Sequence, residues 1–311
     1  MTRRFASITL AAIATVIAGI LFVVIPSQAI KAIHVPLTTS PTDVGLAYEN
    51  FTLTPTDADL TLKGWWMAAD DPVATMVFIH GGGSNRHSTY FESLAFYRAM
   101  VDVGVSVAAI DLRNHGMSGD DGNGLQFGRT EMHDALATID WARTKAGDGP
   151  LFLMGISMGG ATSIHAAHAG AKVDGVILLD PLLDTRDTFM RGGVAQTGLP
   201  AALFAPAAWS AMQFFGLPSG ADEALAKAKT LDVPILLIQD PDDPVTRRPF
   251  AEDLARHNPQ VTLWLPPPID PQHPDLAWKG YWGSHVSAFI FYPEQTTTQI
   301  TQFMEAAQSP L

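Results

Sequence analysis

The chain has 311 residues, of which 47% are hydrophobic and 16% are charged, and its formal net charge is −12. This length is enough for one large α/β domain with an appendage and does not require two domains. The negative charge argues against nucleic acid as a partner, and the absence of cysteine excludes disulfide bonds and cysteine chemistry.

An apolar segment lies near the N-terminus. Arg3 and Arg4 precede an uncharged run from Phe5 to Ile25, which is long enough to cross a bilayer as a helix. The length favours a retained anchor, although Ser27-Gln-Ala29 offers small residues for signal cleavage and secretion. Because basic residues stay cytoplasmic, either interpretation places the rest of the chain outside the cytoplasm. We therefore predict three segments: a membrane anchor or signal at 1–29, a linker at 30–50 and a folded domain at 51–311.

Strand and helix patterns alternate through the remainder of the chain. Apolar runs typical of buried strands lie at Val105–Ile110, Leu151–Met154, Val176–Leu179 and Val233–Ile238. Helical patterns lie at Ser93–Asp102, Thr130–Lys145 and about Pro293–Ala306. This alternation predicts an α/β fold with a mostly parallel central sheet flanked by helices.

A serine between glycines follows one of these strands. Gly155, Ser157 and Gly159 form a Gly-x-Ser-x-Gly pattern between Leu151–Met154 and a run of small, helix-compatible residues. The glycines allow a sharp strand-to-helix turn that exposes the serine. Such a serine needs a histidine to accept its proton and an acid to orient that histidine.

The region at about 185–231 is too long for a simple connection between strands and predicts a cap insertion. From Gly192 to Ala221 it contains no charged residue, but it contains several large apolar ones. These side chains suit an apolar substrate pocket or the packing of the cap onto the core, and both interpretations remain open.

An acid and a base follow in the order that the chemistry needs. The strand Val233–Ile238 ends in an acid-rich turn, which offers Asp240, Asp242 and Asp243 as candidate acids, with Asp180 as a more distant one. His285, in a loop before the last helix, is the favoured base, because its competitor His273 lies between prolines and suits a surface turn.

Several motifs together resemble the α/β-hydrolase family from about Phe51 to the C-terminus. Phe78-Ile-His-Gly-Gly-Gly-Ser-Asn85 looks like the family's strand and His-Gly oxyanion loop. Asp111-Leu-Arg-Asn-His-Gly-Met-Ser118 looks like its Asp-x-Arg-x-His-Gly-x-Ser segment. The turn around Asp243 resembles the acid loop, with Asp240 in place of the usual glycine and Arg247 in place of the usual proline. This resemblance favours Asp243 over its rivals Asp242, Asp240 and Asp180.

Roles follow from the chemistry and from this resemblance. Ser157 is the expected nucleophile, His285 the base and then the acid, and Asp243 the orienting acid. The amides of Met158 and Gly82 are the expected oxyanion donors, with Gly83 close behind.

Other polar residues are given structural roles. Arg113 and His115 are expected to brace the loops around the nucleophile. His165 and His168 share a helix face, but no third ligand with metal spacing appears, so no metal is predicted. The three glycines at 81–83 lack a P-loop or dinucleotide pattern, so no cofactor is predicted.

The sequence therefore predicts a serine hydrolase that cleaves small-molecule esters, with a preference for apolar acyl groups. A serine peptidase of the same fold is the alternative enzyme, because one triad serves both reactions. A non-catalytic binding protein is the alternative outside enzymes. The sequence does not indicate an oligomeric state.

Overall fold

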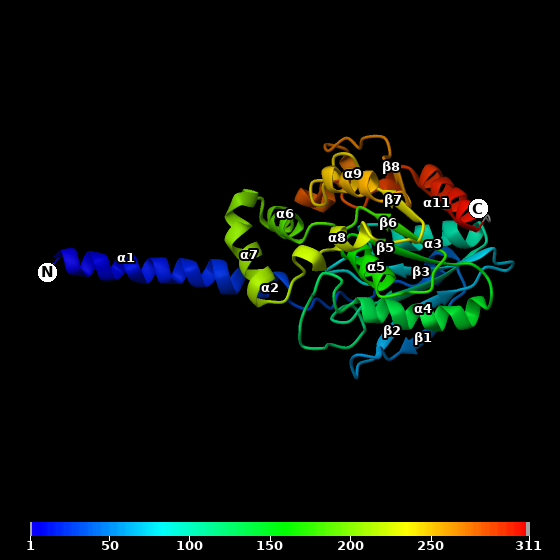
Figure 1. Ribbon diagram of the computed structural model, residues 1–311, viewed down its shortest axis with the longest axis horizontal. Helices are drawn as coiled ribbons and strands as arrows, with labels where there is room; N and C mark the ends of the chain where they lie inside the picture. The colour runs from blue at the N-terminus through cyan, green and yellow to red at the C-terminus, as the bar shows by residue number, and fades with distance from the viewer. Residues whose placement is uncertain (1, 309–311) are drawn as a thin grey trace.

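A computed structural model describes residues 2–308. Met1 and residues 309–311, which belong to the predicted segments 1–29 and 51–311, lie outside the described part. The N-terminal helix consists of α1 (Thr2–Gly19), a π-helical turn η1 (Ile20–Val24) and α2 (Ile25–Ala29), and it projects away from the rest of the molecule (Figure 1). Among the described residues, one helix is long and apolar enough to cross a membrane, Ser7–Ala29, with a mean hydropathy of 2.8.

An eight-stranded sheet forms the centre of the domain, in the order β1-β2-β4-β3-β5-β6-β7-β8. β1 and β2 pair antiparallel, as do β2 and β4, and all other neighbours are parallel. The predicted fold class is confirmed, with an antiparallel edge added to the parallel sheet. The strands are β1 (Glu49–Leu53), β2 (Leu62–Met67), β3 (Ala74–Ile79), β4 (Val105–Asp111), β5 (Leu151–Ile156), β6 (Gly175–Leu179), β7 (Ile235–Ile238) and β8 (Val261–Trp264).

The central strands are buried along their whole length. Every residue of β3, β4 and β5 is buried, because helices cover both faces of the parallel part of the sheet. In β1, at the edge, Phe51 alone is buried. Continuous apolar runs therefore revealed the central strands in the sequence, whereas β1, β2 and β8 were not predicted individually.

Helices cover the two faces of the sheet in separate groups. Apolar residues of α4, α5 and α9 pack on one face, and those of α3 and α11 pack on the other. The helix α3 has the predicted bounds, and α4 begins two residues later than predicted. The helices are α3 (Ser93–Asp102), α4 (Met132–Ala146), α5 (Met158–His168), α9 (Arg248–His257), α10 (Ala288–Phe291) and α11 (Pro293–Gln308), with 3-10 turns η2 (Pro41–Val44) and η5 (Pro274–Trp282).

Further helices lie between β6 and β7, in the segment 185–231 that we call the cap. They are α6 (Thr185–Thr197), η3 (Ala201–Phe204), α7 (Ala205–Phe214), η4 (Gly220–Asp222) and α8 (Ala224–Ala228). Phe204 and Leu217 are buried, whereas Trp209 and Phe214 are exposed. The apolar residues of the cap therefore divide into a group that packs inward and a group that faces outward.

The segment 30–48, between the N-terminal helix and β1, contacts the domain, and β1 begins within the predicted linker 30–50. Ile33 forms an isolated bridge with His115, and the Asn85 side-chain amide donates to the Val35 carbonyl at 2.9 Å. This segment is therefore joined to the loops that follow β3 and β4.

Candidate active site

Ser157 stands at the sharp turn between β5 and α5. Its backbone has φ +52° and ψ −119°, a left-handed conformation that costs free energy in a residue with a Cβ atom. Ser157 is followed at once by α5, which begins at Met158. The turn therefore holds the serine at the carboxyl edge of the parallel strands, where open α/β sheets place their ligand sites.

The two glycines of the pattern are required by close backbone contacts. A Cβ atom on Gly155 would overlap the carbonyl oxygen of Gly159. A Cβ atom on Gly159 would overlap the carbonyl oxygens of Ile79 and His80, at the end of β3. The spacing of the glycines thus reflects how closely α5 approaches the adjacent strands.

A chain of hydrogen bonds joins the three residues predicted to form the triad. His285 Nε2 lies 2.9 Å from Ser157 Oγ, and His285 Nδ1 lies 2.7 Å from Asp243 Oδ2. His285 and Asp243 are buried. The structure therefore brings together a serine, a histidine and an aspartate that lie in three connecting segments far apart in the chain.

The Asp243 carboxylate is held on both oxygens. Oδ1 accepts hydrogen bonds from the backbone amides of Val245, at 2.6 Å, and Thr246, at 3.0 Å. The Thr246 hydroxyl donates to Oδ2 at 2.8 Å. Oδ1 is thereby fixed in the acid loop, and Oδ2 is directed at His285.

The rival acids are placed differently. Asp242 is exposed, and its amide donates to the buried carboxylate of Asp240. Asp180, at the end of β6, accepts a hydrogen bond from the Val286 amide at 3.0 Å. Within residues 2–308, Asp243 is the one acid that hydrogen-bonds to the His285 side chain. Burial, with the nearby charges of Asp243 and Asp240, raises the pKa of Asp180 well above its usual range.

The rival base lies in a surface turn, as the sequence indicated. His273 precedes η5, and its ring accepts a hydrogen bond from the Asp275 amide at 3.3 Å. Its ring also packs edge-on against Phe291. These contacts give His273 a local structural role.

A buried lysine behind His285 had no signal in the sequence. Lys279 Nζ donates to the carbonyls of Tyr90 at 2.7 Å and His285 at 3.1 Å, and to the Ser287 hydroxyl at 2.5 Å. Burial lowers the pKa of Lys279 to about 8. The ammonium therefore ties the histidine loop to the loop after β3, and only the folded chain brings its three acceptors together.

The predicted oxyanion donors belong to two segments that approach each other beside the serine. A Cβ atom on Gly82 would lie 3.3 Å from Met158 Sδ, so the loop after β3 approaches the start of α5 closely. The Gly83 amide donates to His115 Nε2 at 3.1 Å and is therefore engaged elsewhere. Among the hydrogen bonds of residues 2–308, none is donated by the amide of Gly82 or of Met158.

Two neutral histidines hold this loop in shape. His80 Nδ1 pairs with the Gly81 carbonyl at 2.7 Å, while its Nε2 accepts from the Leu112 amide at 3.1 Å. His115 Nδ1 pairs with the Arg113 carbonyl at 2.7 Å. Each ring thus donates from one nitrogen and accepts at the other, which requires the neutral form. Burial lowers the pKa of His80 to about 4 and that of His115 to about 3.

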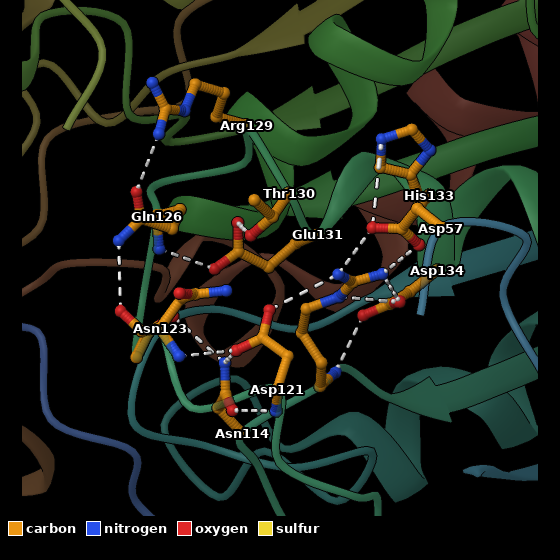
Figure 2. A network of polar contacts seen from close by, with 12 residues as sticks. Asp57, Asn114, Asp121, Asn123, Gln126, Arg129, Thr130, Glu131, His133 and Asp134 are labelled. Atoms are coloured by element: carbon orange, nitrogen blue, oxygen red, sulfur yellow. Dashed lines mark hydrogen bonds and ion pairs between the residues drawn. The ribbon is translucent and has the colours of Figure 1, made fainter. Parts of the chain in front are cut away.

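A buried arginine braces the loop after β4. Arg113 donates to Asp134 and to Asp57, each at 2.7 Å, and lies 3.4 Å from Asp121. Figure 2 shows these three aspartates converging, with Asn114 beside Asp121. Burial raises the pKa of Asp134 to about 6 despite the adjacent guanidinium. These contacts confirm that Arg113 and His115 have the structural role expected from the sequence.

The site also contains three atoms with the spacing of metal ligands. One ligand atom each from Asp180, Asp243 and His285 lies within 4.8 Å of the others. These groups already hydrogen-bond to protein donors, since Asp180 Oδ1 accepts from the Asp240 amide at 2.7 Å and His285 Nδ1 pairs with Asp243. A cation there would have to displace these bonds, so the donor set fits a hydrogen-bonded relay better than a metal site.

The fold and site together define a class of protein. A serine on a strained turn after a parallel strand, bonded to a histidine and through it to an aspartate, is typical of the α/β-hydrolase architecture. The chain matches the family model described as "Alpha/beta hydrolase family" over residues 76–309. The chain therefore belongs to this family, as the resemblance predicted.

Individual proteins show similarity over parts of the chain. Lysophosphatidylserine lipase ABHD12 of Rattus norvegicus is 26% identical over 47% of this chain and 41% of its own length. Phospholipase YtpA of Bacillus subtilis is 33% identical over 38% of this chain and 44% of its own. The chain thus spans less than half the length of these curated relatives. The names of these relatives support a hydrolytic enzyme.

Solved structures share the fold over most of the chain. The esterase Pf2001 of Pyrococcus furiosus has a TM-score of 0.71 and 20% identity, covering 89% of this chain and 97% of the esterase. At this level of identity the likeness shows the fold.

Proposed function

We propose that this protein is a serine hydrolase that cleaves carboxylic esters. The observation that supports this most directly is the pair of hydrogen bonds from Ser157 Oγ to His285 and from His285 to Asp243, at 2.9 and 2.7 Å. The similarity to a phospholipase and a lysophosphatidylserine lipase supports ester hydrolysis as the reaction.

The geometry suits catalysis through an acyl-enzyme. Ser157 Oγ attacks the ester carbonyl carbon while His285 Nε2 takes its proton, and Asp243 stabilises the resulting imidazolium. Collapse of the tetrahedral intermediate breaks the bond to the alcohol, which leaves with the proton from His285. Water, deprotonated by His285, then attacks the acyl-enzyme. The carboxylic acid is released and the Ser157 hydroxyl is restored.

The amides of Gly82 and Met158 are the proposed donors to the oxyanion. Met158 is the first residue of α5, so its N–H points out of a helix N-terminus, where negative charge is favoured. Because the Gly83 amide is bonded to His115, Gly82 is the better candidate for the second donor.

Apolar acyl groups are the proposed preference. The cap contains no charged residue between Gly192 and Ala221, and an apolar group is favoured in such surroundings by up to about 0.8 kcal/mol per buried methylene. Catalytic efficiency should therefore rise from acetate to medium-chain esters. A flat profile, with efficient cleavage of peptide amides, would redirect the proposal to a serine peptidase.

The N-terminal helix is the proposed membrane anchor. Ser7–Ala29 is long and apolar enough to span a bilayer, and Arg3 and Arg4 ahead of it favour a cytoplasmic N-terminus. We propose the division of the chain into an anchor at 1–29, a linker at 30–50 and an extracytoplasmic domain at 51–311.

Labelling with a fluorophosphonate tests the proposed nucleophile. Ser157→Ala should abolish both labelling and ester hydrolysis, because one oxygen performs both reactions. Ser163→Ala is the matched control on the same helix, since its hydroxyl donates only to the Gly159 carbonyl, and it should retain both. Labelling of the Ser157→Ala protein would refute the assignment. A folded wild type that neither labels nor hydrolyses esters would indicate a binding protein.

A further inference from the structure

Four large apolar side chains of the cap are exposed to solvent. Leu199, Leu203, Trp209 and Phe214 are each between 50% and 72% exposed. They lie within the uncharged stretch from Gly192 to Ala221. We call these four residues the outer cap surface. A cluster of large apolar side chains at the surface, without charges among them, indicates an interaction site.

This surface is continuous with the N-terminal helix. The ring of Trp209 packs edge-on against Phe22, with ring centroids 6.0 Å apart, and against Phe214 at 5.6 Å. The Ser210 hydroxyl donates to the Phe22 carbonyl at 2.5 Å. Figure 1 shows α7 beside the point where the projecting helix meets the domain. The helix and the part of the outer cap surface formed by Trp209 and Phe214 therefore make one apolar face.

The join between helix and domain is packed and hydrogen-bonded. Pro26 and Ile30 are buried, and Ile30 packs into the apolar core on the face of the sheet covered by α4 and α5. The Ile30 carbonyl accepts a hydrogen bond from the Leu125 amide at 2.7 Å. Insertion of the helix into a bilayer therefore fixes the position of the cap relative to the bilayer surface.

The position of the contact along the helix sets the depth of the cap. A hydrocarbon core about 30 Å thick takes about 20 residues of helix, which reaches from Ser7 to about Pro26. Phe22 then lies about 6 Å inside the edge of the hydrocarbon, at about 1.5 Å per residue. Trp209 is in contact with Phe22 and thus lies near the boundary between hydrocarbon and headgroups, where tryptophan is enriched.

We propose that the outer cap surface is inserted into the outer leaflet of the bilayer that the N-terminal helix spans. The occupant of this surface is lipid, because the surface continues an apolar helix of membrane-spanning length and contains no charge. The catalytic domain is then held with its cap against the membrane and does not hang from a flexible tether.

The same geometry deepens the proposed function, on which this step rests. Ile33 is four residues beyond Ala29, so it lies at most about 14 Å from the end of the helix. A Cβ atom on Gly83, in the oxyanion loop, would lie 3.5 Å from Ile33 Cδ1. The site is therefore close to the leaflet, and the substrate class is a lipid ester resident in the bilayer.

Depth-dependent fluorescence quenching tests the placement without measuring catalysis. Because the chain has no cysteine, single-cysteine variants of the full chain can be labelled with a nitrobenzoxadiazole probe and placed in phosphatidylcholine vesicles. Phe214→Cys and Leu203→Cys report on the outer cap surface, and Ile13→Cys on the helix. Val73→Cys is the control. Val73 is an exposed apolar residue just before β3, at the amino ends of the parallel strands, whereas Ser157 lies at their carboxyl ends.

Phospholipids brominated on the acyl chains should quench the probes at Ile13, Phe214 and Leu203 at least about threefold more than the probe at Val73, because interfacial segments lie about 5–10 Å deep. Quenching at Ile13 without quenching at Phe214 and Leu203 would overturn the proposal and leave the anchor in place. No quenching at Ile13 would refute the anchor and the proposal together. Protection of the cap probes from aqueous iodide without bromolipid quenching would also overturn it, since a second protein copy would then cover the surface. None of these readouts depends on ester hydrolysis.

Discussion

Replacement of Asp243 by asparagine should move the proton of the neutral His285 ring from Nδ1 to Nε2. The amides of Val245 and Thr246 both donate to Oδ1, so the asparagine oxygen must occupy that position. The NH2 group then replaces Oδ2, 2.7 Å from His285 Nδ1. A donor at this point requires Nδ1 to accept, which moves the imidazole proton to Nε2. The nitrogen that should take a proton from Ser157 then donates one instead.

The expected loss is large and falls on the chemical step. An inverted tautomer of this kind lowers kcat by about 10⁴-fold in related triads, which corresponds to about 5.4 kcal/mol of transition-state stabilisation. KM should change little, because Asp243 is buried behind His285 and the loss concerns the proton transfer.

Steady-state hydrolysis of a chromogenic ester, with thermal denaturation as a check on folding, measures this effect. Asp242→Asn is the matched control: Asp242 is exposed and its backbone amide, not its side chain, bonds to Asp240, so it should keep wild-type kcat. An Asp243→Asn enzyme that retains more than about a tenth of wild-type kcat would refute the assigned role. Equal losses of kcat in both variants would mean that neither is established as the orienting acid, and the role would then have to be sought at Asp240 or Asp180.

Three further predictions follow from individual contacts. Thr246→Val removes a donor to Asp243 and should lower kcat/KM by about tenfold, or about 1.4 kcal/mol; Thr246→Ser should restore it, and a fully active valine variant would contradict this. Gly159→Ala should lower the free energy of unfolding by about 3 kcal/mol or more, because its Cβ overlaps backbone atoms. Gly192→Ala, inside α6 with open space around it, should instead raise the stability by up to about 1 kcal/mol in thermal denaturation. Burial lowers the pKa of His165 to about 4. As the pH falls below about 6.5, this histidine therefore binds a proton in the unfolded chain before it does so in the folded protein. The free energy of unfolding should then fall by about 1.4 kcal/mol per pH unit down to about pH 4. His165→Leu should make this decline shallower by that amount in denaturant titrations, and equal slopes would argue against it.

The sequence by itself determined the family, the central strands and the turn that holds Ser157. These features depend on local requirements. Strands buried on both faces need continuous apolar runs, as in β3, β4 and β5. The turn around Ser157 needs glycine at 155 and 159, because a side chain there would overlap neighbouring backbone. Such requirements leave a pattern within a few adjacent residues.

Tertiary structure decided what depends on residues far apart in the chain. Four aspartates were candidates for the acid, and only the folded loops show that Asp243 contacts His285 while Asp242 is exposed to solvent. The role of Lys279 depends on acceptors that only the folded loops bring together. The exposure of Phe214, beside Trp209 and its contact with Phe22 of the N-terminal helix, is visible only in the folded chain. Composition measures how apolar a segment is, but the direction of each side chain is set by the packing of its element against distant ones.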